Sequence, residues 1–119
     1  MIRRLLFLLP LFALALAACA VTSEHTTTNG VVSVTNDTST SEWKPQALFV
    51  VFPTAQTGTL TVTRTARGVR VPLASHAFSN VSAVTWLPSA DYPIRPGNVL
   101  TVTSSVQNLT LQLERNPFP

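Results

Sequence analysis

The segment TLTVTRTARGVRVPL (Thr59–Leu73) decides the fold class of this 119-residue chain. Leu60 and Val62 alternate with threonines before Ala66-Arg67-Gly68, and the alternation resumes with Val69, Val71 and Leu73. A period of two places the apolar side chains on one face of a strand. A short loop with glycine between two such runs is typical of a β-hairpin. The segment therefore predicts two antiparallel strands.

The same pattern recurs in short segments on both sides of this hairpin. They are residues 31–35, 47–52, 81–87, 98–104 and 108–114. In the last of them Leu109, Leu111 and Leu113 alternate with polar residues, and no helical period of useful length is present. We expect an all-β fold, an antiparallel two-sheet sandwich of about seven strands with immunoglobulin-like or fibronectin-like architecture. A small β-barrel is the alternative.

The first residues have the composition of a targeting segment. Arg3 and Arg4 precede an apolar run, residues 5–16, which is shorter than the roughly 20 residues needed to cross a bilayer and contains Pro10. This is the pattern of a secretory signal peptide, so residues 1–18 are excluded from the fold.

The end of that run, Leu16-Ala17-Ala18-Cys19, resembles the lipobox of bacterial lipoproteins. The resemblance covers the leader only. It implies that Cys19, the single cysteine, becomes the first residue of the mature chain and carries the lipid, whose two or three acyl chains (palmitate among them) give firm membrane attachment. It also implies a bacterial envelope location, facing the periplasm from the outer membrane in a Gram-negative cell, because Ala20 replaces the aspartate that favours inner-membrane retention. The alternative is ordinary signal cleavage, since Ala18-Cys19-Ala20 also fits the A-x-A pattern.

The mature chain is long enough for one domain. About 100 residues support a modest single core. Residues 19–30 form a polar stretch after the cysteine, which we expect to be a lipidated N-terminus and flexible tether. Residues 31–119 form the β domain. No disulfide is available to it once Cys19 is used.

Charge argues against a nucleic-acid partner. Once Arg3 and Arg4 leave with the signal peptide, the basic and acidic residues nearly balance, and no basic run is present.

The residues that catalysis requires are sparse. His25 lies in the expected tether, and Ser75 and His76 are neighbours that would project from opposite faces of a strand. One histidine and scattered carboxylates make no zinc site. We expect no enzyme activity, no metal and no cofactor.

Three candidate surfaces remain. Phe49 and Phe52 fall on opposite faces of an apolar strand, so a protein partner could cover one of them, although a loop or residues 117–119 could do so instead. Arg64, Arg67 and Arg70 surround the hairpin tip and could bind an anion. Trp43 and Tyr92 could form a glycan platform, whereas Trp86 alternates with Val84 as a core residue does.

We therefore expect a lipid-anchored structural or accessory subunit that contacts an envelope protein. The alternative is a small binding module for glycan or another anionic envelope ligand.

Overall fold

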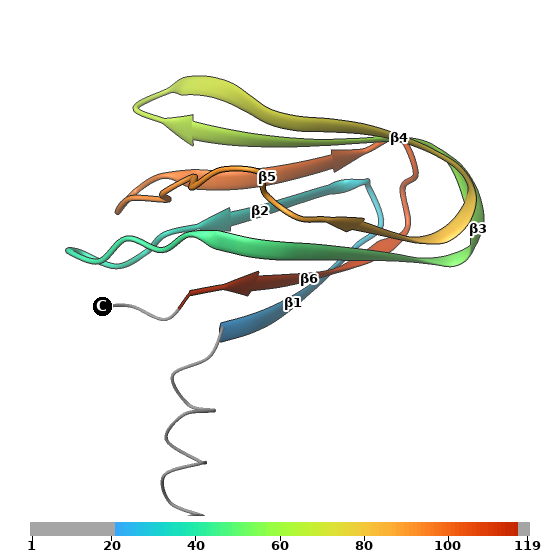
Figure 1. Cartoon of the computed structure of the whole chain (residues 1–119), viewed down its shortest axis with the longest axis horizontal. Helices are drawn as coiled ribbons and strands as arrows, with labels where there is room; N and C mark the ends of the chain where they lie inside the picture. Colours follow the sequence, from blue (N-terminus) through green and yellow to red (C-terminus); the bar gives the residue numbers. More distant parts are fainter. Residues whose placement is uncertain (1–20, 117–119) are drawn as a thin grey trace, which may run out of the picture.

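The computed structural model describes residues 21–116. The signal peptide, Cys19 and residues 117–119 lie outside the described residues. All regular secondary structure in the described part is β-strand: β1 (Val21–Thr27), β2 (Val31–Thr35), β3 (Pro45–Ala66), β4 (Val69–Trp86), β5 (Val99–Ser104) and β6 (Leu109–Arg115) (Figure 1). Residues 21–116 accordingly contain no helix that could span a membrane. The expected all-β class is confirmed.

The strands form one antiparallel sheet that folds over on itself and is nearly closed into a barrel. The first part of β3, Pro45 to Val51, pairs with β6, and its last part, Leu60 to Thr65, pairs with β5. Strand β4 follows β3 through both parts. The result is two facing layers, β1-β6-β3-β4 and β2-β5-β3-β4, joined at the bend of the long hairpin (Figure 1).

The bend in β3 and β4 has local causes in the sequence. Pro53 has no N–H for a ladder, and the β3–β4 register shifts between Val51 and Gln56 and again before Gly58. On β4, Asn80 has a φ of 51° and its N–H donates to Thr57 Oγ1 at 3.0 Å. Register shifts and left-handed residues bend a paired strand without ending it. The expected seven short strands are therefore six, because β3 and β4 each continue through this bend as one strand where two were expected, and β1 is added.

The predicted hairpin turn is confirmed. Ala66 pairs with Val69, leaving the two-residue turn Arg67-Gly68 with φ values of 53° and 77°. Two successive positive φ angles belong to the type I′ turn, whose twist matches that of the flanking strands.

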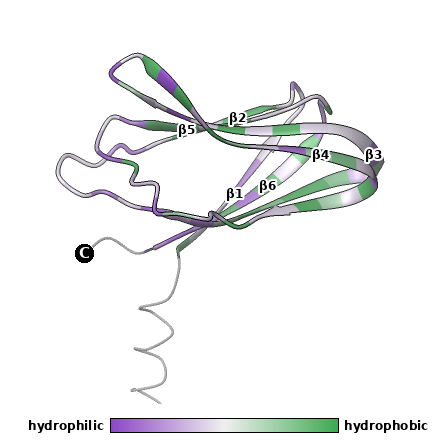
Figure 2. Ribbon diagram, turned by 45° about the horizontal axis from the view of Figure 1, so that its top comes forward, coloured by the Kyte–Doolittle hydropathy of each residue, from purple (hydrophilic) through white to green (hydrophobic). Residues whose placement is uncertain are grey.

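The core lies between the two layers. Leu109, Leu111 and Leu113 of β6 are buried, as their alternation predicts, and they face apolar side chains of β3 and β5. Green hydrophobic bands alternate along these strands in Figure 2. The other core residues lie on β2, β3, β4 and β5 and at the Trp43–Ile94 bridge. They include Val32, Leu48, Val50, Phe52, Leu60, Val62, Leu100 and Val102.

The expectation of a flexible tether up to residue 30 is wrong from Val21 onward. Strand β1 pairs with β6 along its whole length, from Val21 opposite Arg115 to Thr27 opposite Leu109. The stretch is poor in large apolar side chains, but an edge strand is held largely by backbone hydrogen bonds, and threonine and valine suit a strand. Residues 21–27 therefore belong to the β domain, which does not start as late as Val31.

Candidate functional site

Two pockets lie where the tip of the β3–β4 hairpin meets the turn at residues 95–98. One pocket of about 410 Å³ is lined by Arg64, Ala66, Arg95 and Asn98, together with Asp91, Tyr92 and Pro93. A second pocket of about 610 Å³ shares Ala66, Arg95 and Asn98 and adds Arg67, Pro96 and Gly97. The two pockets adjoin at Ala66, Arg95 and Asn98, which line both. Three arginines from two separate segments therefore line two adjoining pockets, which we call the arginine depression.

Each arginine reaches the depression in a different way. Arg64 lies near the end of β3, and its guanidinium NH1 donates to the Pro93 carbonyl at 3.1 Å. Arg67 occupies the first turn position and is exposed. Arg95 precedes a turn in which the Asn98 N–H donates to its carbonyl at 2.9 Å. An arginine fork is suited to bidentate contact with phosphate or carboxylate, so the depression has the chemistry of an anion site.

Arg70 does not belong to this group. It pairs with Thr65, whereas Arg64 pairs with Val71. Directly opposed residues share a face of the hairpin and neighbouring positions alternate, so Arg70 projects from the face opposite to Arg64. The predicted trio of Arg64, Arg67 and Arg70 is wrong in its last member. Arg95 takes that place, and no local pattern in the sequence could have shown it.

Acidic residues moderate the charge nearby. Asp91 lines the first pocket, and its Oδ2 lies 3.3 Å from Lys44 Nζ. Glu42 Oε2 lies 3.7 Å from Arg95 Nε. Both pairs are largely exposed, so each contributes little to stability. Within residues 21–116, Arg64 and Arg67 form no ion pair.

A buried asparagine holds the loop structure behind the depression. Asn36 is 1% exposed, and its Nδ2 donates to the carbonyls of Ser41 and Ile94 at 2.8 and 2.7 Å. Its Oδ1 accepts from the N–H and the hydroxyl of Thr38. The side chain thus ties the loop of residues 36–44 to the 87–98 loop. No cluster of three potential metal ligands occurs among the described residues.

The glycan platform of Trp43 and Tyr92 is wrong. Trp43 is 2% exposed and pairs through its backbone with Ile94, and the Arg115 guanidinium lies over its ring at 5.3 Å. Tyr92 instead stacks on Trp86, with 6.2 Å between ring centroids. Trp86 is half-buried against the core and not fully inside it. Trp43 is therefore a core residue.

The two phenylalanines of β3 do lie on opposite faces. Phe52 is 2% exposed and stacks on Phe78 with centroids 5.1 Å apart, so it is not available to a partner. Phe49 is half-buried on the outer face, between Gln112 of β6 and Thr85 of β4. Val51 follows on that face, 50% exposed, next to Ala83. We call Phe49, Val51 and Ala83 the outer apolar patch.

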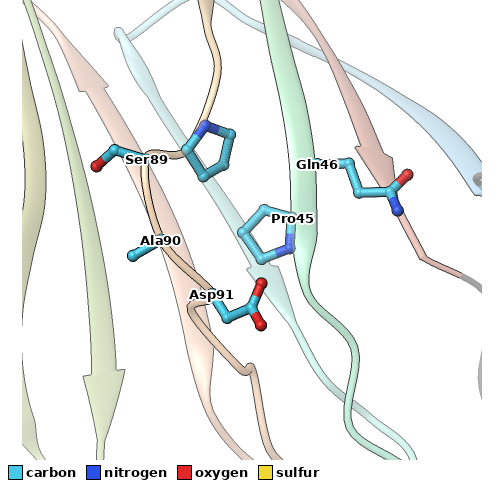
Figure 3. A pocket seen from close by; sticks show the side chains of 6 residues that line it. Pro45, Gln46, Ser89, Ala90 and Asp91 are labelled. Atoms are coloured by element: carbon cyan, nitrogen blue, oxygen red, sulfur yellow. The ribbon is translucent and has the colours of Figure 1, made fainter.

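A further pocket lies at the start of β3. It measures about 300 Å³ and is lined by Pro45, Gln46 and residues 88–91 (Figure 3). The Asp91 carboxylate is its only charged group and already pairs with Lys44. This pocket offers little to orient a ligand.

Ser75 and His76 are both exposed, and they pair with Thr61 and Leu60 respectively. They therefore project from opposite faces of β4, so the hydroxyl and the imidazole do not face one another.

Comparison with known proteins supports the fold. No family model and no curated protein matches the sequence. Among solved structures, the chain is similar to the Drosophila NLP core, described for pentamer formation and histone binding, with a TM-score of 0.52, 14% identity, and coverage of 82% of this chain and 95% of that one. It is also similar to CpGH89CBM32-6 of Clostridium perfringens, with a TM-score of 0.50, 6% identity, and coverage of 81% and 94%.

A third similar structure is a putative alpha-L-fucosidase from Bacteroides thetaiotaomicron, with a TM-score of 0.51 and 6% identity. The match covers 77% of this chain and 21% of that much longer one. Identities this low establish a shared β architecture and nothing about activity.

Proposed function

We propose that the protein is a lipid-anchored lipoprotein of the bacterial envelope that acts by contact, as a structural or accessory subunit of an envelope assembly. The anchor is the acylated Cys19, the location is the outer membrane facing the periplasm in a Gram-negative cell, and the protein is not an enzyme. The lipobox residues Leu16 to Cys19 support the anchor.

The outer apolar patch is the observation that carries the contact role. Phe49 and Val51 stand on the solvent side of a layer whose opposite side already packs the core. A sandwich normally places polar side chains on that outer face, and β6 does so with Thr110, Gln112 and Glu114. An aromatic and a valine beside them suit the centre of a protein interface better than a solvated surface.

In vivo crosslinking tests this role. A photo-reactive residue at Val51 should form a defined adduct with one envelope protein, and Val51→Glu should abolish co-purification of that protein. The matched control is Thr103→Glu, which introduces the same charge at an exposed position of β5 in the other layer. If neither the wild-type protein nor the Thr103→Glu variant co-purifies with a partner, the proposal is rejected.

The arginine depression favours a second candidate, a binding module for an anionic envelope ligand. Arg64, Arg67 and Arg95 border one open depression with a single carboxylate, Asp91, in its lining. This candidate predicts saturable binding of a phosphate- or carboxylate-bearing ligand that Arg67→Gln weakens.

A further inference from the structure

The short connection between Cys19 and β1 limits how far the domain can stand from its anchor. Strand β1 starts at Val21, so only Ala20 separates it from the proposed lipid attachment site. Two residues of chain span at most about 7 Å. If Cys19 carries the lipid, as the proposed function states, the end of the sandwich that holds Val21 is kept at the membrane surface.

That end of the sandwich is also where the basic residues lie. Val21 pairs with Arg115, which in turn pairs with Pro45 next to Lys44. The β3–β4 hairpin tip and the 87–98 loop are at this end too (Figure 1). Every lysine and arginine of residues 21–116 is therefore here: Lys44, Arg64, Arg67, Arg70, Arg95 and Arg115.

The opposite end is uncharged. It consists of the turn at residues 28–30, the bends at 53–58 and 78–82, and the turn at 104–108, which are joined by hydrogen bonds such as Gly30 N–H to the Gln107 carbonyl at 2.9 Å. None of these segments contains Lys, Arg, Asp or Glu. Within residues 21–116, the lysines and arginines thus lie at the end of the domain that holds Val21, and the turns and bends of the opposite end carry no charge.

The acidic residues offset only part of the charge of the arginine depression, because neither Arg64 nor Arg67 forms an ion pair within residues 21–116. Glu42 and Asp91 pair with Arg95 and Lys44, and Asp37 and Glu114 do not line either pocket. Arg64 is held at the rim by its hydrogen bond to Pro93. An arginine fixed in place loses less conformational freedom when it binds an oxyanion, and its planar fork matches phosphate geometry.

We propose that the depression formed by Arg64, Arg67 and Arg95 binds the phosphate group of anionic phospholipids in the membrane that holds Cys19. This contact orients the domain with its uncharged end away from the membrane. The outer apolar patch then lies on a side wall of the domain, where a neighbouring envelope protein can reach it.

The test uses the mature chain with Cys19→Ser, so that vesicle binding reports the depression and not the acyl chains. Co-sedimentation is measured with phosphatidylcholine vesicles with and without phosphatidylglycerol. We expect binding only to the anionic vesicles, weakened by salt. A basic residue at such a surface contributes about fivefold in affinity, so Arg64→Gln with Arg67→Gln should reduce binding by roughly 25-fold.

Arg70→Gln is the matched control because Arg70 lies two residues beyond the turn but on the other face. It should reduce binding less than Arg67→Gln does, because it removes the same charge without removing a contact in the depression. Equal losses for Arg67→Gln and Arg70→Gln would overturn the depression as a site, since they would mean that only general charge matters. Circular dichroism of each variant checks the fold, and Arg67→Gln alone, at an exposed turn position, suffices if Arg64→Gln does not fold.

Inorganic phosphate distinguishes a free soluble anion from the phosphate group of a lipid as the ligand of the depression. If phosphate shifts the amide resonances of Gly68 and Asn98 while anionic vesicles do not bind, the site takes a soluble anion and the membrane proposal is overturned. Palmitate labelling of the wild type and of Cys19→Ser tests the anchor separately, so a failure there is not confused with a failure of the depression.

Discussion

Arg64 and Arg70 lie on the two arms of one hairpin, three residues on either side of Arg67, and project from its opposite faces. The cause is the two-residue turn, which pairs Arg64 with Val71 and Thr65 with Arg70. One arginine therefore borders the depression with Arg95, and the other belongs to the outer face of the sheet.

Asp91→Asn should strengthen binding of anionic vesicles by about two- to fivefold, because it removes the only carboxylate in the lining of the depression. The exposed pair with Lys44 is lost at a cost below about 1 kcal/mol. Co-sedimentation at low salt measures the gain. Asp37→Asn is the control, since it removes the same charge from an exposed loop position outside the lining, and an equal gain there would contradict a localised site.

Phe52→Ala should lower the free energy of unfolding by about 3–5 kcal/mol, because it removes a buried ring stacked on Phe78. Phe49→Ala, on the outer face of the same strand, should cost less than about 1.5 kcal/mol. Urea unfolding followed by tryptophan fluorescence measures both values. Similar losses for the two variants would mean that Phe49 is covered within the domain.

Gly68→Ala should destabilise the domain by about 1–2 kcal/mol. Gly68 has a φ of 77°, and an added Cβ would meet no atom within 4 Å, so the cost is conformational and not steric crowding by neighbours. Arg67→Asn, which introduces a residue that favours this turn, should leave stability unchanged or slightly higher. A thermal midpoint for Gly68→Ala equal to that of the wild type would contradict the type I′ turn.

Asn36→Ala should cost about 1–3 kcal/mol, because the carbonyls of Ser41 and Ile94 lose the amide that bonds them inside the loop structure. The neighbouring Asp37 is exposed, so Asp37→Ala should stay within about 0.5 kcal/mol. Chemical denaturation compares the two. Hydrogen exchange at Ile94, whose N–H bonds the Trp43 carbonyl at 2.7 Å, should accelerate in Asn36→Ala only.

The strands and the hairpin could be predicted because their causes are local. Alternation in Leu109, Leu111 and Leu113 follows from strand geometry alone, and a short loop with glycine between two alternating runs is typical of a hairpin. The missed strand, β1, has no such signal. Its inward positions, Ser23, His25 and Thr27, are polar, and its order comes from backbone pairing with β6, a partner more than 80 residues away.

The candidate site was only half predictable for the same reason. Arg64 and Arg67 are close in sequence, but Arg95 comes from the 87–98 loop, which is linked to the rest of the domain by the Asn36 amide and by the Trp43–Ile94 bridge. Trp43, which its burial removes from any glycan platform, forms one half of that bridge.

The sequence by itself determined the all-β class, the hairpin around Ala66-Arg67-Gly68 and the alternating core positions, since these depend on the period of apolar residues and on the conformational freedom of glycine in a short loop. Only the tertiary structure decided that the apparent seven strands are six, that residues 21–27 belong to the domain, and that Arg95 and not Arg70 joins Arg64. The physical reason is that these features depend on contacts between segments far apart in the chain, which no local pattern encodes. They are the bend in β3 and β4, the pairing of β1 with β6, and the hydrogen bonds of Asn36 that hold the 87–98 loop.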